Sequence, residues 1–128
     1  MVTFTRFEAA GAPKAQGGYA QALEVADAAR WLYISGQVPV GADGAVPVTF
    51  EDQARQVWAN LEAQLRAAGM GLDNLVKLTV FLSDRSFATA NRAVRQEVLG
   101  DRQVAMSVII AGIFDAGWLL EIEAVAAA

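Results

Sequence analysis

Apolar and polar residues alternate in several short stretches of the chain, a pattern typical of half-buried β-strands. The first stretch covers residues 2–7. Two further strands are predicted over residues 20–26 and 30–37, and because only Asp27-Ala28-Ala29 separates them, we expect them to pair as an antiparallel hairpin. The remaining predicted strands are residues 75–82, 103–110 and 118–125.

Apolar residues at helical spacing predict two helices between these strands. The first begins after Thr49, which together with Asp52 resembles a capping box; its apolar residues recur at helical spacing from Phe50 up to Gly69. The second runs over residues 85–99 and stops at Gly100. The residues of this second helix expected to face inward are Phe87, Ala90, Val94 and Val98.

The order of the elements predicts an α+β fold in a single domain over residues 1–128. We expect a mixed six-stranded sheet with two helices on one face. The two last strands carry apolar residues on both faces, so the face of the sheet without helices is also apolar. In the strand over residues 75–82, one face is expected to hold Val76, Leu78, Val80 and Leu82, and the other Lys77, Thr79 and Phe81.

Composition adds a reason to expect an oligomer. The 128 residues are 55% hydrophobic and 19% charged, against about 25% charged in an ordinary soluble domain. A small monomer cannot hide that much apolar surface. Subunit packing would cover it.

Charge and residue usage exclude several functions. The net charge of −4 offers no attraction for a phosphate backbone, so no nucleic-acid partner is expected. The chain has neither Cys nor His, which excludes disulfides, thiolate nucleophiles and a Ser-His-Asp triad, and disfavours a metal site. The N-terminal residues lack the continuous apolar stretch of a signal peptide, and no apolar run in the chain has the length of a membrane span, so we expect a cytoplasmic protein.

Two carboxylates near the end of the chain are the best chemical signal. Glu121 and Glu123 are two residues apart on a predicted strand, so they share one face between apolar neighbours. They fit the solvated face of a terminal strand. They also fit a carboxyl with a raised pKa that exchanges a proton with water or substrate. A glycosidase pair is discounted because nothing else resembles a sugar cleft.

Two other side chains have both a structural and a functional interpretation. Tyr19 follows Gly17 and Gly18, so its phenol could lie at the mouth of a pocket or its ring could pack on the sheet. Asn91 lies near the inner border of the second predicted helix, where a polar residue is more often solvated.

Taken together, several segments resemble the Rid/YjgF family, the reactive intermediate deaminases formerly called L-PSP endoribonucleases. They follow one another in the family's order over nearly the whole chain. In the first half they are APKAQGGYAQA at 12–22, SGQVP at 35–39, Gln53, Asn60-Leu61 and AAG at 67–69. In the second half they are VKLTVFLSD at 76–84, Phe87-Ala88, Asn91 and EIEA at 121–124.

The resemblance implies a chorismate-mutase-like (YjgF-like) fold and a homotrimer with three small-molecule clefts between subunits. In the family's deaminases an Arg binds the substrate carboxylate, and a Glu and backbone groups position water. An imine or enamine is hydrolysed to a keto acid and ammonia without a cofactor. Carried over by position, Glu121 is the catalytic residue, and the substrate-binding residues are Tyr19, Ser35, Gly36, Asn91, Ala105, Met106 and Ser107.

The chain departs from the family pattern at the substrate-binding Arg. The family's deaminases have Pro-Ala-Arg followed by Ser or Thr, with the Arg fifteen residues before the Glu, where this chain has Val104-Ala105-Met106-Ser107. Arg102 is the nearest substitute on this strand, but four residues of strand at about 3.3 Å each place it roughly 13 Å away. Met106 offers no charge to a carboxylate, so efficient deamination of small imino acids is not expected.

Two functions follow. The first is a Rid-type hydrolase that acts on a less anionic imine, enamine or related small molecule through Glu121 and water. The alternative is a non-catalytic small-molecule-binding or regulatory trimer. Ribonuclease activity follows only from the family's former name, and the acidic charge and the lack of His argue against it.

Overall fold

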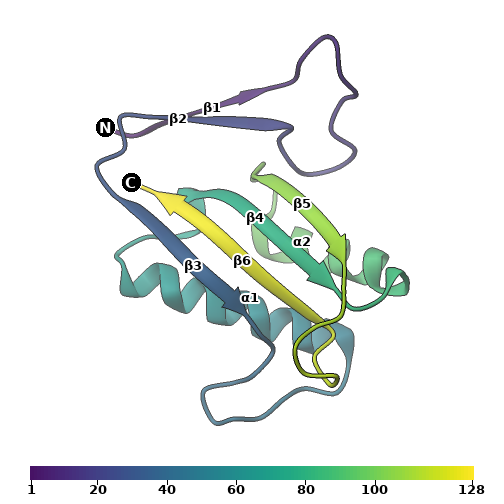
Figure 1. Ribbon diagram of the computed structural model, residues 1–128. Coiled ribbons are helices and arrows are strands. Elements are labelled where there is room, and N and C mark those ends of the chain that lie inside the picture. Colours follow the sequence, from purple (N-terminus) through teal and green to yellow (C-terminus); the bar gives the residue numbers. More distant parts are fainter.

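The six strands divide between two sheets. The computed structural model describes all of residues 1–128. Strands β3, β6, β4 and β5, in that order, form a four-stranded sheet, and β1 and β2 form a separate two-stranded ribbon (Figure 1). The strands are β1 Thr3–Phe7, β2 Ala22–Ala26, β3 Trp31–Gln37, β4 Leu75–Leu82, β5 Ala105–Ile110 and β6 Leu120–Ala127. The helices are α1 Phe50–Ala67 and α2 Ala88–Leu99, with 3₁₀ turns at Leu72–Asn74 and Arg85–Phe87.

The α+β fold is therefore confirmed, with both helices on one face of the sheet (Figure 1). The predicted six-stranded sheet differs in its strand count, because only four of the six strands lie in it. The ribbon joins the main sheet at the start of β5, where the Ala20 amide donates to the Val104 carbonyl at 3.0 Å. Arg6 Nε also donates to the Gln103 carbonyl at 2.7 Å.

The predicted hairpin of the second and third strands is wrong. Strand β2 pairs with β1 and β3 pairs with β6, both antiparallel. Asp27 adopts a left-handed φ of +58°, and the next amides, of Ala29 and Arg30, both donate to the carbonyl of Ala128. The short connection between β2 and β3 does not predict this pairing, because the strand that pairs with β3 comes from the other end of the chain.

Helix α1 forms as its sequence predicts. The Thr49 hydroxyl accepts a hydrogen bond from the Asp52 amide at 3.2 Å, which satisfies one of the free N–H groups of the first turn. Gly69, with φ of +70°, ends the helix in a conformation that a side chain would resist. Its buried stripe includes Val57, Trp58 and Leu61, all at most 1% exposed. Burial of each such large apolar side chain contributes about 1.5–3 kcal/mol.

Strand β4 places its apolar side chains as predicted, with one exception. Leu78, Val80 and Leu82 are at most 1% exposed beneath the helices. At the start of the strand Leu75 is buried and Val76 only half-buried, because the register with β6 shifts between Leu75 and Lys77. The bulge exchanges the two neighbours between the faces.

Helix α2 turns a more polar stripe inward than expected. The predicted inward residues Phe87, Ala90 and Val98 are only half-buried, although Val94 is buried. Phe87 stacks on Phe50 of α1 with ring centroids 4.7 Å apart. The buried residues of the helix are Asn91, Val94, Arg95 and Leu99.

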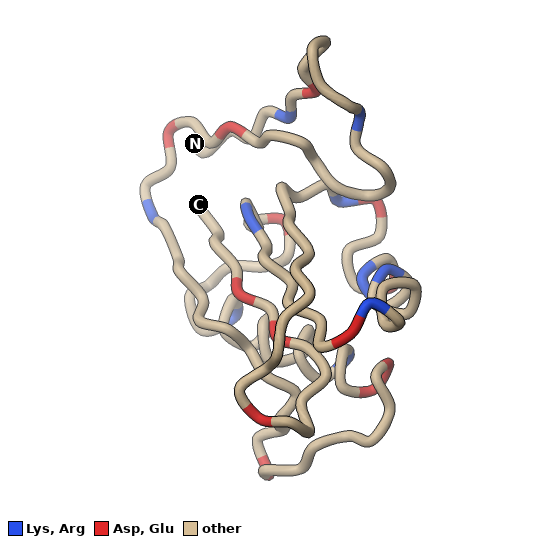
Figure 2. Tube along the Cα trace, turned by 45° about the vertical axis from the view of Figure 1, so that its right-hand side comes forward, with Lys and Arg blue, Asp and Glu red and all other residues tan.

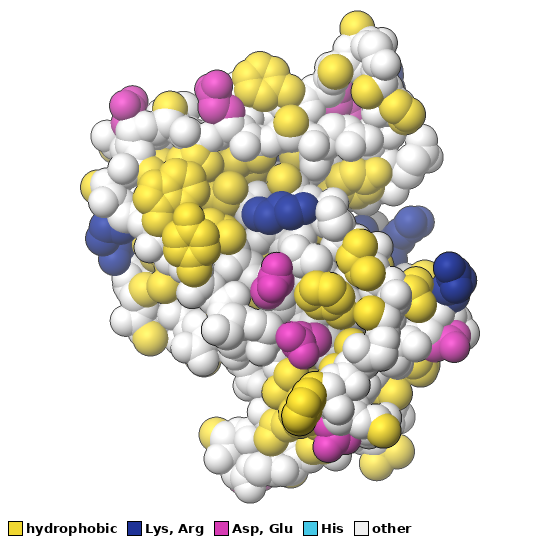
Figure 3. Space-filling view, in the orientation of Figure 1, with side chains coloured by type: hydrophobic (Ala, Val, Ile, Leu, Met, Phe, Trp, Pro, Cys, Tyr) yellow, Lys and Arg dark blue, Asp and Glu magenta, His cyan; other side chains and the backbone are white.

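The face of the sheet without helices is open and partly apolar (Figure 3). Trp31 and Tyr33 of β3 are 49% and 76% exposed, and Ile109 of β5 is 44% exposed. Neither helix has the length and apolar character needed to cross a lipid bilayer. The open face therefore carries part of the exposed apolar surface that the composition predicts.

Candidate functional site

Glu121 lies beside an irregularity in the pairing of β3 with β6. Ile34 pairs with Ala124 and Gln37 with Ile122, so Ser35 and Gly36 together oppose one residue of β6. Such a β-bulge bends the strand and leaves the extra residue's backbone out of the ladder. Within this bulge the Ser35 carbonyl accepts a hydrogen bond from Gln37 Nε2 at 2.9 Å.

Gly36 leaves the space that the Glu121 side chain occupies. A Cβ on Gly36 would lie 2.6 Å from Cδ and 2.9 Å from Cγ of Glu121, so any side chain at position 36 would force the Glu121 side chain to move. The Glu121 carboxylate is half-buried and forms no hydrogen bond or ion pair within the chain. Its acceptor oxygens are therefore free for water or a ligand. We name Ser35, Gly36 and Glu121 the Glu121 site.

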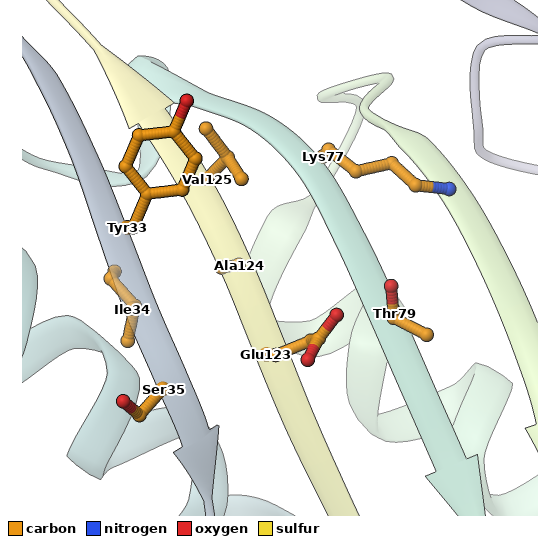
Figure 4. A pocket seen from close by; sticks show the side chains of 8 residues that line it. All are labelled: Tyr33, Ile34, Ser35, Lys77, Thr79, Glu123, Ala124 and Val125. Atoms are coloured by element: carbon orange, nitrogen blue, oxygen red, sulfur yellow. The ribbon is translucent and has the colours of Figure 1, made fainter.

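Glu123 is the β6 residue opposite the bulge and lines a cavity together with Ser35, but its carboxylate does not lie over Gly36. It is exposed and pairs across the strands with Thr79, whereas Glu121 pairs with Phe81. Glu123 lines a shallow cavity of about 240 Å³ in which the side chains of Tyr33, Thr79 and Glu123 project from the sheet (Figure 4). The solvated interpretation fits Glu123, and Glu121 is the carboxylate that a ligand could use.

A second group of predicted residues lies on the other face of the sheet, beside α2. A cavity of about 360 Å³ opens there between α2, the edge strand β5 and the loop before β2. Tyr19 and Met106 line it, and the Tyr19 oxygen accepts a hydrogen bond from the Gln16 amide at 3.1 Å. We name this cavity the Arg95 pocket; its lining residues are Gln16, Tyr19, Gln21, Arg92, Arg95, Met106 and Val108.

Arg95 is the residue of this pocket that sequence reasoning missed. Its Nη1 donates to the sulfur of Met106 and its Nη2 to the carbonyl of Gly17, both at 3.2 Å. Burial lowers the pKa of Arg95, and the charge of Arg92 acts in the same direction while Tyr19 opposes it. The guanidinium nevertheless stays protonated, because arginine does not lose its proton in proteins. The one feature of the sequence that could have indicated a buried Arg95 is its position one helical turn after Asn91.

Arg102, the substitute considered from sequence, is engaged elsewhere. Its Nε donates to Asp73 at 2.7 Å, and its Nη1 donates to the carbonyl of Leu99 at 3.2 Å. It does not line the Arg95 pocket. A guanidinium does reach Met106, but it comes from the neighbouring helix rather than from the same strand.

The other predicted residues divide between the two faces. Asn91 is 4% exposed on the buried stripe of α2. Ala105 and Ser107 point to the open face, where the Ser107 hydroxyl accepts a hydrogen bond from Lys77 Nζ at 3.0 Å. One chain therefore does not bring all eight residues into one cleft. A cleft that contains both the Glu121 site and the Arg95 pocket would have to combine two chains.

Other polar side chains of the matching segments hold loops in place. Gln53 is 2% exposed, donates to the carbonyls of Pro47 and Gly117 and accepts from the Leu119 amide. Asn60 donates to the carbonyls of Val38 and Val40, just after the bulge. Asn60 thereby fixes the loop that leaves the Glu121 site.

Comparison with known proteins places the chain among Rid-type sequences. A family model described as endoribonuclease L-PSP matches residues 9–128. A RutC family protein of Pyrococcus horikoshii is 35% identical over 117 residues, which cover 90% of each chain. TdcF of Escherichia coli strain K12, whose name assigns it as a candidate reactive intermediate deaminase, is 37% identical over 87 residues, 66% of this chain and 65% of its own.

Solved structures agree along nearly the whole length. The Rid-family protein YyfB of Yersinia pestis has a TM-score of 0.80 at 26% identity and covers 98% of both chains. E. coli TdcF, crystallised with bound serine, has a TM-score of 0.74 at 29% identity and covers 97% of this chain and 98% of its own.

Proposed function

Because this chain belongs to the Rid/YjgF family, matched by the endoribonuclease L-PSP family model, we propose that it hydrolyses a small imine or enamine in clefts between the subunits of a homotrimer. The observation that supports this most directly is the Glu121 carboxylate, which lies over Gly36 beside the bulge and has no partner in its own chain. A carboxylate held there can accept a proton from water.

The reaction follows from the groups at the Glu121 site. The oxygen of a water held by Glu121 adds to the imine carbon while Glu121 takes one water proton. Glu121 passes that proton to the substrate nitrogen, which gives a carbinolamine. Glu121 then takes the hydroxyl proton of the carbinolamine and delivers it to the nitrogen as the C=O double bond forms and the C–N bond breaks. An enamine first becomes the imine by gaining a proton at carbon and losing one from nitrogen. The products are a carbonyl compound and ammonia. Nothing is oxidised or reduced, so the step needs no cofactor.

The homotrimer is supported by two features of the fold. The open face carries Trp31, Tyr33 and Ile109 in exposed positions, and a partner would remove this apolar area from water. The Glu121 site and the Arg95 pocket lie on opposite faces of one sheet, so two chains are needed to bring them together.

Residue 106 favours a second candidate function. Met106 offers no charge, so a chain that keeps the clefts without catalysis would bind a small molecule as a regulatory trimer. The two functions differ at Glu121, because binding alone does not need its proton transfer. The expected absence of a cofactor and of a nucleic-acid partner, and the cytoplasmic location, stay predictions.

The test compares two glutamates on the same strand face. Imines are generated in the assay by an amino-acid oxidase or an amine oxidase, and their decay is followed by ultraviolet absorbance in stopped flow. Glu121→Gln should lower the rate of hydrolysis by about 10²–10⁴, as is usual when a general base is removed. The exposed Glu123→Gln should stay within about twofold of the parent. Equal rates in both variants, or a parent no faster than buffer, would favour the binding trimer.

A further inference from the structure

Arg95 is a buried cation for which the chain supplies no anion. The residue is 6% exposed. The three ion pairs of the chain involve Arg55 and Arg102, and none involves Arg95. Buried arginines are ordinarily paired, because a charge removed from water needs compensation. Arg95 therefore lacks the partner that its position demands.

The two contacts of Arg95 leave most of its donors unused. A guanidinium presents five N–H groups, and only one on Nη1 and one on Nη2 are engaged. The acceptors are a thioether, which accepts weakly, and a neutral carbonyl. Both hold the side chain in place without neutralising it. The three remaining N–H groups are enough to bind a carboxylate through two parallel hydrogen bonds.

The Arg95 pocket has the chemistry of an anion site. Its lining contains two arginines and no acidic residue. Arg92 is exposed at its rim and adds a second positive charge, and basic positions gather on α2 (Figure 2). The Tyr19 oxygen accepts from Gln16, so its own O–H is free to donate. Met106 and Val108 offer an apolar wall beside these donors.

We propose that Arg95 binds the carboxylate of a small anionic ligand in this pocket, with Arg92 as the outer charge. The proposal rests on the proposed function in one respect: the ligand is taken to be the imine or enamine that Glu121 hydrolyses. Helix α2 then supplies the charge that residue 106 does not. Met106 is a positioning residue, because its sulfur holds the guanidinium toward the pocket. The substrate class becomes a small imino or enamino acid with an apolar side chain.

The site is a carboxylate site rather than a general phosphate site. The planar fork of Arg95 matches two carboxylate oxygens, and the apolar wall faces the rest of the ligand. A phosphate presents more oxygens than Arg95 alone can pair, and the second cation, Arg92, is exposed. Inorganic phosphate is therefore the discriminating competitor.

Binding is measured separately from turnover so that the two proposals can fail independently. Isothermal titration of the parent with pyruvate, pyruvamide and inorganic phosphate uses a stable carboxylate, its neutral isostere and the competing anion. Pyruvate should bind at least about tenfold more tightly than pyruvamide, which is the value of one charged hydrogen bond. Equal affinities, or tighter binding of phosphate, would overturn the carboxylate assignment.

Variants then assign the site to Arg95. Arg95→Gln should weaken pyruvate binding about ten- to a hundredfold, and Arg95→Lys should weaken it less because it keeps the charge. Arg102→Gln, which alters a guanidinium already paired with Asp73, should bind pyruvate as the parent does. Light scattering and circular dichroism confirm that each variant is folded. If Arg95→Gln fails to fold, Arg95→Lys decides, because its single ammonium cannot form the two parallel hydrogen bonds and should bind pyruvate more weakly than the parent. Pyruvate affinity equal to that of the parent would be contrary to the proposal.

Glu121→Gln separates the two proposals. It should keep pyruvate binding while it loses hydrolysis. If the parent binds pyruvate through Arg95 but hydrolyses no imine, the anion site is supported and the proposed hydrolase activity is contradicted. If the Arg95→Gln variant hydrolyses an imino acid as fast as the parent does, the hydrolase activity is supported and the anion site is contradicted.

Discussion

The Glu121 site and the Arg95 pocket are built by different means. The first is made by backbone: a bulge in β3, a glycine and a register that sets a carboxylate over it. The second is made by side chains that converge from a helix, an edge strand and a loop. A backbone site tolerates little change of residue, whereas a side-chain site can obtain its charge from another element. This difference explains how the pocket can have Met106 at the predicted Arg position and still contain a guanidinium.

For the proposed homotrimer, trimers assembled from two variants test whether the two regions act together across chains, and this effect should be the largest. Glu121→Gln and Arg95→Gln subunits are inactive alone if both groups are needed. If each cleft takes Glu121 from one chain and Arg95 from another, random 1:1 reassembly leaves both groups intact in about a quarter of the clefts. Imine hydrolysis should then recover to about a quarter of the parental rate.

In the control, each variant alone is taken through the same unfolding and reassembly. Light scattering confirms the trimer before each assay. No recovery in the mixed sample would show that both groups serve one cleft from the same chain, or that they do not cooperate.

Gly36→Ala tests the backbone region alone. The new Cβ would overlap the Glu121 side chain, which must move away from the bulge. Hydrolysis should fall about 10²-fold, because misplacement of a catalytic group by about 1 Å has that effect. Titrated pyruvate should bind as in the parent.

Gly112→Ala is the matched control, since nothing lies within 4 Å of a Cβ at that position. It should leave both hydrolysis and binding unchanged. A Gly36→Ala protein with full activity would mean that the position of Glu121 over Gly36 is irrelevant to the chemistry.

Much of the fold could be predicted because it depends on local patterns. The Thr49 cap, the Gly69 stop and the alternation in β4 are each decided by neighbouring residues, and α1 and β4 were correctly predicted, except for the face of Val76. The pairing of β3 with β6 was not, since the two strands are far apart in sequence and the short connection after β2 resembled a hairpin turn.

The candidate site divides in the same way. Glu121 was visible as a carboxylate among apolar neighbours on a strand, and the structure places it beside Gly36. Arg95 was not visible, because a charged residue near the end of a helix ordinarily faces water. Only the packing of α2 on β5 shows that it is buried. The periodic pattern of apolar residues does not show that the long Arg95 side chain extends from α2 to β5.

Met106→Leu probes the side-chain region more gently. The substitution keeps the volume but removes the sulfur that accepts from Arg95. Pyruvate affinity should fall only a few-fold, as expected for one weak acceptor, and the free energy of unfolding should change by less than about 1.5 kcal/mol. Titration and urea unfolding measure the two effects.

Met70→Leu, in the core at 7% exposure, is the control for a Met-to-Leu change, because the Met70 sulfur accepts no hydrogen bond whereas that of Met106 does. It should leave pyruvate affinity unchanged. If both variants bind pyruvate as the parent does, the sulfur contact does not position Arg95.

The smallest effect is expected where the Arg95 pocket depends on the start of its helix. Asp84 Oδ1 accepts a hydrogen bond from the Ser86 amide at 2.8 Å in the turn that leads into α2. This backbone hydrogen bond lowers the pKa of Asp84 below its usual value of 3.8, with a smaller contribution from Arg85. A carboxyl with a lower pKa in the folded state stabilises the fold above its unfolded pKa, and the stabilisation is lost as the pH falls through the folded pKa. Asp84→Ala should therefore lower the thermal midpoint by a few degrees at pH 7. The difference from the parent should shrink as the pH falls below about 4.

Asp101→Ala, at an exposed carboxylate with no bonded partner, is the control and should show no difference from the parent at either pH. A gap between Asp84→Ala and the parent that persists unchanged in acid would mean that the Asp84 charge does not stabilise the start of α2, and that the helix that carries Arg95 is held by its packing alone.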